Sequence, residues 1–89
     1  MRVNETNHAP DALALAALGW ILQETGRADR LLALTGLTPE NLRAQLGEPA
    51  LLAAILRFLE AHEPDLLACA EALGVAPARL VEARRSLER

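Results

Sequence analysis

Apolar residues recur along the chain at the spacing of helix faces, and glycine or proline separates each apolar stretch from the next. In 49–62, Leu51, Ile55 and Leu59 follow the three-to-four-residue spacing that places side chains on one face of an α-helix. No stretch alternates apolar and polar residues as a half-buried strand does, and the β-branched residues are scattered. The pattern therefore predicts an all-α fold.

Proline and glycine mark the expected helix ends, because proline fits the first turn of a helix and glycine follows its last turn. Residues 1–8 are polar and unpatterned, which predicts a flexible tail before a single compact bundle over 9–89. We expect the two most apolar helices to form a central pair. The expected five or six short helices lie at about 10–25, 28–35, 39–46, 49–62, 64–73 and 77–88.

One sequence frame, Gly–apolar–x–Pro–x–x–Leu, occurs in "LTGLTPENLRA" (34–44) and again in "ALGVAPARLVEA" (72–83). Within it, glycine ends one helix, proline starts the next, and leucine returns to the core. The second occurrence also has the small residue Ala70 four positions before Gly74 and Leu80 six positions after it, as a helix-turn-helix requires. The frame predicts helix-turn-helix-like corners, either from duplication of a three-helix unit or from recurring cap residues.

A DNA-reading helix must present polar or basic side chains to bases and phosphates. The helix at about 77–88 offers Glu82 and Arg85 outward, beside alanine, proline and valine. The net charge of −3 also gives no general field that would attract nucleic acid or anionic membranes. A helix-turn-helix DNA-binding protein is therefore the alternative function, and nucleic acid is not the expected partner.

Composition narrows the cellular setting. The apolar run 12–22 is too short to span a bilayer, and the residues before it are not basic, so we expect a core helix and no export signal. The single cysteine excludes an intramolecular disulfide framework and is compatible with a reducing cytoplasm. We expect a cytoplasmic protein without a membrane segment.

Candidate catalytic and metal-binding residues are few. Cys69 lies among leucine and alanine and is expected to be a small buried hydrophobe, while Trp20 is expected to anchor the first helix. Ser86 is the only serine, so no serine triad can be assembled. His62 adjoins Glu63, but neighbouring residues do not converge on a helix. We expect no enzyme activity, no cofactor and no catalytic or metal site.

Arginines are expected to act as solvated ion-pair partners. Arg57 interrupts the most apolar helix, and its head is expected to reach Glu60 or Glu24, although an arginine in a functional groove is an alternative. Near the C-terminus, cations alternate with carboxylates at helical spacing. The expected pairs there are Arg79–Glu82 and Arg85–Glu88, with Arg84 and Arg89 completing a solvated face.

The segments "LALTGLTPENLR" and "PALLAAILRFL", followed by an acidic break and a Leu-rich helix, resemble the alphaproteobacterial domain-of-unknown-function family 3572. The resemblance covers about 12–87. It implies a small cytoplasmic bacterial protein and assigns no activity, ligand or catalytic residue.

The apolar surface of the helices at 10–25 and 49–62 exceeds what so small a chain is expected to cover. We therefore predict a small non-enzymatic protein-interaction module. It would bind a protein partner, or form a homo-oligomer, through those two helices. A small-molecule or metal site between helices is a further alternative.

Overall fold

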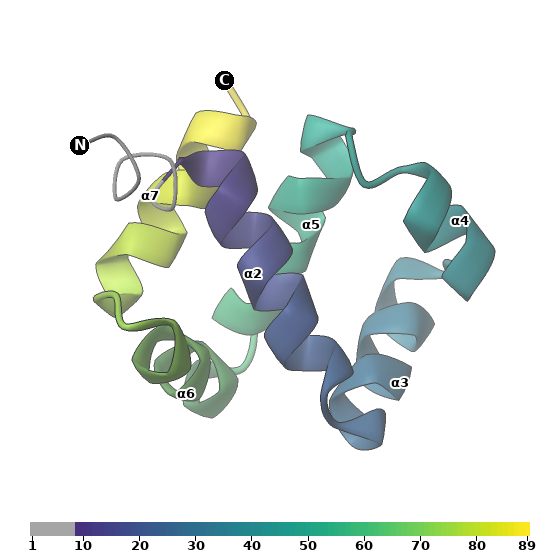
Figure 1. Ribbon diagram of the computed structural model, residues 1–89, viewed down its shortest axis with the longest axis horizontal. Coiled ribbons are helices and arrows are strands. Elements are labelled where there is room, and N and C mark those ends of the chain that lie inside the picture. The colour runs from purple at the N-terminus through teal and green to yellow at the C-terminus, as the bar shows by residue number, and fades with distance from the viewer. Residues whose placement is uncertain (1–8) are drawn as a thin grey trace.

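The computed structural model describes residues 9–89, and this part of the chain forms six α-helices and no strand (Figure 1). The all-α prediction is therefore confirmed. The predicted tail, 1–8, lies outside the described residues. The helices are α2 (Pro10–Leu22), α3 (Thr25–Thr35), α4 (Pro39–Ala44), α5 (Pro49–Glu60), α6 (Glu63–Leu73) and α7 (Pro77–Leu87).

Three helices, α2, α5 and α7, pack against one another at the centre, and α6 contacts all three (Figure 1). On the other side, α3 packs against α2 and α5, while the six-residue α4 lies at the periphery. The expected central pair, α2 and α5, therefore needs correction. α7 belongs to the centre as well, because its Leu80 and Ala83 are buried.

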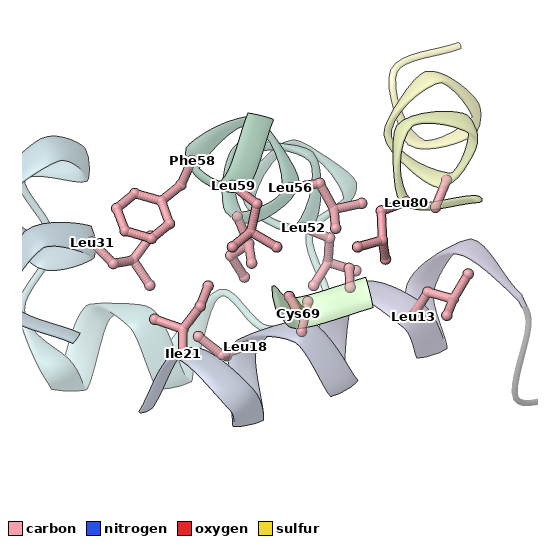
Figure 2. Packing of buried hydrophobic residues seen from close by; sticks show 14 of the residues in the cluster. Leu13, Leu18, Ile21, Leu31, Leu52, Leu56, Phe58, Leu59, Cys69 and Leu80 are labelled. Atoms are coloured by element: carbon pink, nitrogen blue, oxygen red, sulfur yellow. The ribbon is translucent and has the colours of Figure 1, made fainter. Parts of the chain in front are cut away.

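The core is apolar throughout, since no polar or charged residue is buried in the described part of the chain. Leu31 of α3 and Phe58 of α5 lie toward one end of the cluster, and Leu13 of α2 and Leu80 of α7 lie toward the other (Figure 2). Helices of this length are marginal in isolation. Burial of each leucine, at about 1.5–3 kcal/mol, is therefore what holds them in place.

The two corners made by the repeated frame both turn at a left-handed glycine. Gly36 has φ +72° and Gly74 has φ +73°, and no other described residue has a positive φ. At the first corner, the Gly36 N–H donates to the carbonyl of Leu32 at 2.8 Å. Thr38 then caps α4, because its Oγ1 accepts from the Asn41 N–H at 3.1 Å.

The second corner closes with a different hydrogen-bond pattern. The Val75 N–H donates to the Ala70 carbonyl at 3.0 Å, and the Gly74 N–H donates to the Glu71 carbonyl at 3.1 Å. These two bonds form a Schellman motif, whereas the Gly36 corner has the simpler single bond of an αL cap. The structure thus confirms the frame as a helix-ending and helix-starting device at both places.

Some helix boundaries differ from those expected. α2 ends at Leu22 and α3 begins at Thr25, so Gly26 lies in the first turn of α3 and caps nothing. The break is a tight turn, in which the Gln23 N–H donates to the Trp20 carbonyl at 3.2 Å. A turn of this kind needs no residue in the left-handed conformation. The position of Gly26 therefore placed the end of the first helix too late, at about residue 25.

The other differences are smaller. α4 ends at Ala44, so Gly47 belongs to the following turn. α6 begins at Glu63, one residue before the proline. The first turn of a helix leaves its N–H groups unpaired in any case, so proline is tolerated at the second position as well as the first.

Candidate functional site

An apolar groove of about 320 Å³ lies between α2, α3 and α4. Leu18 and Leu42 are buried at its base, and Leu22 stands at its edge with 47% of its surface exposed. Arg43 is the only charged side chain among the lining residues, and it makes no ion pair with the described residues. The groove is lined by Leu18, Leu22, Ala28, Leu32, Pro39, Leu42, Arg43 and Leu46.

Local sequence features build this groove. The tight turn after Leu22 folds α3 back along α2, and the left-handed Gly36 with the Thr38 cap then redirects the chain into α4. Each of the three helices therefore presents one apolar side to a common space. α4 contributes one buried residue, Leu42, to the core, and its Pro39 and Arg43 line the groove beside it.

The outer face of α2 continues the groove surface. We use the name α2 face for Leu15, Ala16, Gly19 and Leu22, all of which are exposed. A Cβ atom placed on Gly19 would meet no atom within 4 Å. No other helix lies in front of α2 in Figure 1. Within 9–89, no other helix covers this apolar side of α2, as expected for the helix at 10–25.

The apolar face expected on α5 is absent. Every large apolar side chain of this helix, including Phe58, is buried. Ala50 and Arg57 are among the residues that it exposes instead. The prediction of surplus apolar surface on 49–62 was wrong because α7 covers that side of α5, an arrangement that the helical periodicity did not reveal.

The α6–α7 corner has the shape of a helix-turn-helix. Ala70 and Leu80 are 1% and 0% exposed, as that geometry requires. However, α7 packs along both α2 and α5, and its outward side carries Glu82 beside Arg85. Arg79 lies 3.9 Å from the Glu82 carboxylate, which confirms that predicted pair. The geometry therefore favours a structural corner.

An ion-pair network joins the end of α7 to α5. The Arg84 Nε donates to Glu60 Oε2 at 2.6 Å, and its Nη1 donates to Glu88 Oε1 at 2.8 Å. The Arg57 Nε donates to Glu88 Oε2 at 2.5 Å. The partners predicted for Arg57 and Arg85 were wrong. Glu60 is engaged by Arg84, and Glu88 is shared between Arg57 and Arg84.

The network shifts the pKa values of Glu88 and Arg84. The hydrogen bond from Arg57, together with that from Arg84, holds the pKa of Glu88 below its ordinary value. The hydrogen bond to Glu60, followed by that to Glu88, raises the pKa of Arg84. The two arginines and two glutamates of the network neutralise one another, and Arg85 and Arg89 lie exposed beside it.

Arg27 was not singled out from the sequence, yet it covers Trp20. Its guanidinium carbon lies 3.7 Å from the centre of the indole ring, and its Nη2 donates to the Trp20 carbonyl at 2.8 Å. Its Nε is buried and has no hydrogen-bond partner. Trp20 lies in α2 and Arg27 in α3, on either side of a turn, so the spacing of residues along one helix could not predict this contact. Trp20 is half-buried under the arginine and packs against the edge of the core.

Arg30 and His62 converge on Asp65 and so link α3 to α6. The Arg30 Nη2 lies 2.8 Å and the His62 Nδ1 lies 3.0 Å from Asp65 Oδ2. Burial alone would raise the pKa of Asp65, but the hydrogen bonds from Arg30 and His62 outweigh it and lower that pKa. Within 9–89, no group of three or more His, Cys, Asp or Glu side chains could hold a metal ion.

Cys69 is fully buried, as predicted. Burial raises the pKa of its thiol to about 11. The thiol is therefore protonated at neutral pH and packs as a small hydrophobe, without the thiolate that a nucleophile needs.

Ser86 lies beside Arg79 and Ala83 at a depression on α7.

The hydropathy of the helices and comparisons with other proteins complete the description of the chain. Among the helices of 9–89, none has both the length and the hydropathy needed to cross a membrane. No curated protein and no solved structure matches the chain. A family model does match, over residues 7–89, which is nearly the whole chain. The resemblance found in the sequence is thereby confirmed, and the chain belongs to DUF3572, a family of proteins of unknown function.

Proposed function

We propose that the protein is a non-enzymatic interaction module that binds an apolar helix in the groove between α2, α3 and α4. The groove itself is the observation that carries this proposal, because three helices surround it with apolar side chains and Leu22 remains half-exposed at its edge. Apolar surface left uncovered next to a hollow is characteristic of protein-binding sites.

The chemistry of the lining supports binding over catalysis. Seven of the eight lining residues are apolar and the eighth is Arg43, so no carboxylate, imidazole, hydroxyl or thiol lines the groove. The size also fits, because a cavity of about 150 Å³ holds a benzene-sized molecule. A groove of about 320 Å³ can therefore take two neighbouring side chains from one face of a helix.

A random peptide library displayed on phage would test this proposal on the whole chain. We expect enriched peptides to carry apolar residues three or four positions apart. Leu22→Glu should weaken their binding about tenfold or more, because it places a charge at the edge of the groove. Leu67→Glu is the matched control, since Leu67 has the same 47% exposure on α6. Absence of enrichment, or equal binding to the Leu22→Glu variant, would contradict the proposal.

DNA binding by the α6–α7 corner is the second candidate. The Schellman turn and the burial of Ala70 and Leu80 favour it. The exposed Glu82 and the acidic net charge oppose it. Titration of mixed duplexes at low salt would decide, because binding carried by phosphate contacts is strongest there. Absence of affinity at low salt would remove this candidate.

The cellular setting is part of the proposal. A single cysteine that is buried and protonated suits a reducing bacterial cytoplasm, where the module would meet its partner.

A further inference from the structure

We infer that the partner of the α2 face is a second copy of this chain, packed antiparallel along α2 so that the two helices are related by a two-fold axis. The inference rests on the proposed function, because Leu22 lines both the α2 face and the groove. The helix that would occupy this surface is α2 of the second copy.

The absence of charge along most of α2, from Ala12 to its last residue, is the first argument. No charged side chain occurs from Ala12 to Leu22, so the α2 face offers nothing that would recognise a charged partner. An apolar face without charge is complementary to another of the same kind, and burying it leaves no charge unpaired.

The other exposed leucines lie in a different setting. Leu67 on α6 stands one turn from Glu63 and one turn from Glu71. Leu34 on α3 stands one turn from Arg30. On α2, by contrast, the surface between the exposed Leu15 and Leu22 carries no charged side chain, and Asp11 lies one turn before Leu15, at the N-terminal edge of this surface. The chain itself supplies a helix of the required chemistry.

The order of side chains on the α2 face suits a two-fold contact. Leu15 and Leu22 are seven residues apart, which is about two helical turns, and the small residues Ala16 and Gly19 lie between them. In an antiparallel pair, Leu15 of one copy meets Leu22 of the other, and the small residues let the backbones approach. The contact is isologous, so it closes after two copies and does not propagate.

The groove then becomes part of the interface. Leu22 lies at its edge, so Leu15 from the second copy reaches the mouth of the groove. α2 has 13 residues and is about 20 Å long, which is too short to supply about 800 Å² per partner by itself. The interface must therefore include the rim of the groove, and we expect a weak dimer with a dissociation constant of about 100 µM.

Sedimentation equilibrium of the whole chain, from about 10 µM to about 1 mM, tests the inference. We expect the mass to rise from 9.6 kDa toward twice that value as concentration increases. Raising the salt concentration should preserve or strengthen the dimer, because it screens the repulsion between two acidic copies and the α2 face has no charge. A mass of one chain at every concentration would overturn the inference.

Variants locate the interface. Leu15→Glu and Leu22→Glu should each raise the dimer dissociation constant about tenfold or more, while Leu67→Glu should leave it unchanged. Gly19→Gln is the sharpest variant. A side chain at this position meets no atom of its own chain, and glutamine favours helix, so the monomer should fold at least as well while dimerisation is lost. A dimer that survives Gly19→Gln and both glutamates would contradict the inference.

The two proposals fail in different ways. A monomeric chain whose groove still selects helical peptides through Leu22 would end the dimer and keep the proposed function. A chain that neither dimerises nor selects peptides would end both.

Discussion

At the scale of single residues, three glycines in helical surroundings are expected to respond in opposite directions. Gly36 and Gly74 adopt left-handed conformations, whereas Gly19 lies inside α2 with open space around it. A Cβ opposes the left-handed conformation and favours the helical one, because alanine loses less backbone entropy than glycine. The sign of a glycine-to-alanine change therefore depends on its place in the fold.

Gly74→Ala should lower the free energy of unfolding by about 1 kcal/mol, and Gly19→Ala should raise it by about 0.5–1 kcal/mol. Urea denaturation followed by circular dichroism would measure both changes. The measurement should be made at low protein concentration, where the chain is monomeric. Equal effects of the two substitutions would contradict the conformations assigned to these glycines.

Cys69 provides a second test at this scale. Because the pKa of its buried thiol is raised to about 11 from an ordinary value of 9.0, a disulfide reagent at pH 8 should label it only after urea unfolds the chain. The raised pKa also stabilises the fold up to about pH 9, and that stability should be lost as the pH rises toward about 11. Rapid labelling of the folded chain at pH 8 would disagree with the burial of this residue.

At the scale of elements, the network at the end of α7 decides how this helix is held. Arg84 bonds Glu60 of α5 and Glu88 of its own chain end, whereas the adjacent Arg85 is exposed. Neighbouring arginines on one helix therefore have different structural roles.

Arg84→Ala should lower the melting temperature at pH 7, and Arg85→Ala should leave it almost unchanged. The pKa of Glu88 is lowered, so its contribution is present above the ordinary carboxyl pKa and is lost as the pH falls through the lowered value. The difference between wild type and Arg84→Ala should accordingly shrink as the pH falls through the lowered pKa of Glu88. Differential scanning calorimetry at several pH values would measure it. A difference that does not depend on pH would argue against the ion pairs.

The elements that could be predicted from the sequence are those that local chemistry specifies. Gly36, Gly74 and the prolines marked helix ends to within one residue, because caps depend on residues close in sequence. The turn at 23–24 carries no such signal, so the end of α2 was misplaced.

Features that depend on contacts between distant residues were not predictable. The groove needs the packing of three helices, and the covering of α5 by α7 needs the whole topology. The contacts of Arg27 with Trp20 and of Arg30 with Asp65 have no recognisable spacing. Two exposed apolar faces were predicted, and only that of α2 is found exposed. Helical periodicity shows that a helix face is apolar, but it does not show which other helix packs against that face.

At the scale of the whole molecule, stability should be distributed unevenly. α2, α5 and α7 share the central core, while α4 is short, peripheral and held by Leu42. Segments with few buried apolar contacts open at lower free energy than the core does.

Amide hydrogen exchange should therefore separate α4 from the centre. We expect the Leu42 amide to exchange through local opening and the Ile55 amide to exchange only through global unfolding. Both side chains are buried, at 7% and 0% exposure, so a difference between them reflects the helix and not local exposure. Equal protection of the two amides, measured by NMR, would mean that α4 unfolds together with the core.

The peripheral position of α4 also has a thermodynamic consequence for recognition. One wall of the groove belongs to a short peripheral helix that a single buried leucine holds, so we expect an occupant to reduce the motion of that wall when it binds. The conformational entropy lost in this step weakens binding, but the same freedom lets the wall adjust to occupants of different shape. Calorimetry should find an unfavourable entropy of ordering that offsets part of the gain from apolar burial. A disulfide fixing α4 to α3 should tighten binding and narrow the range of helices that the groove accepts.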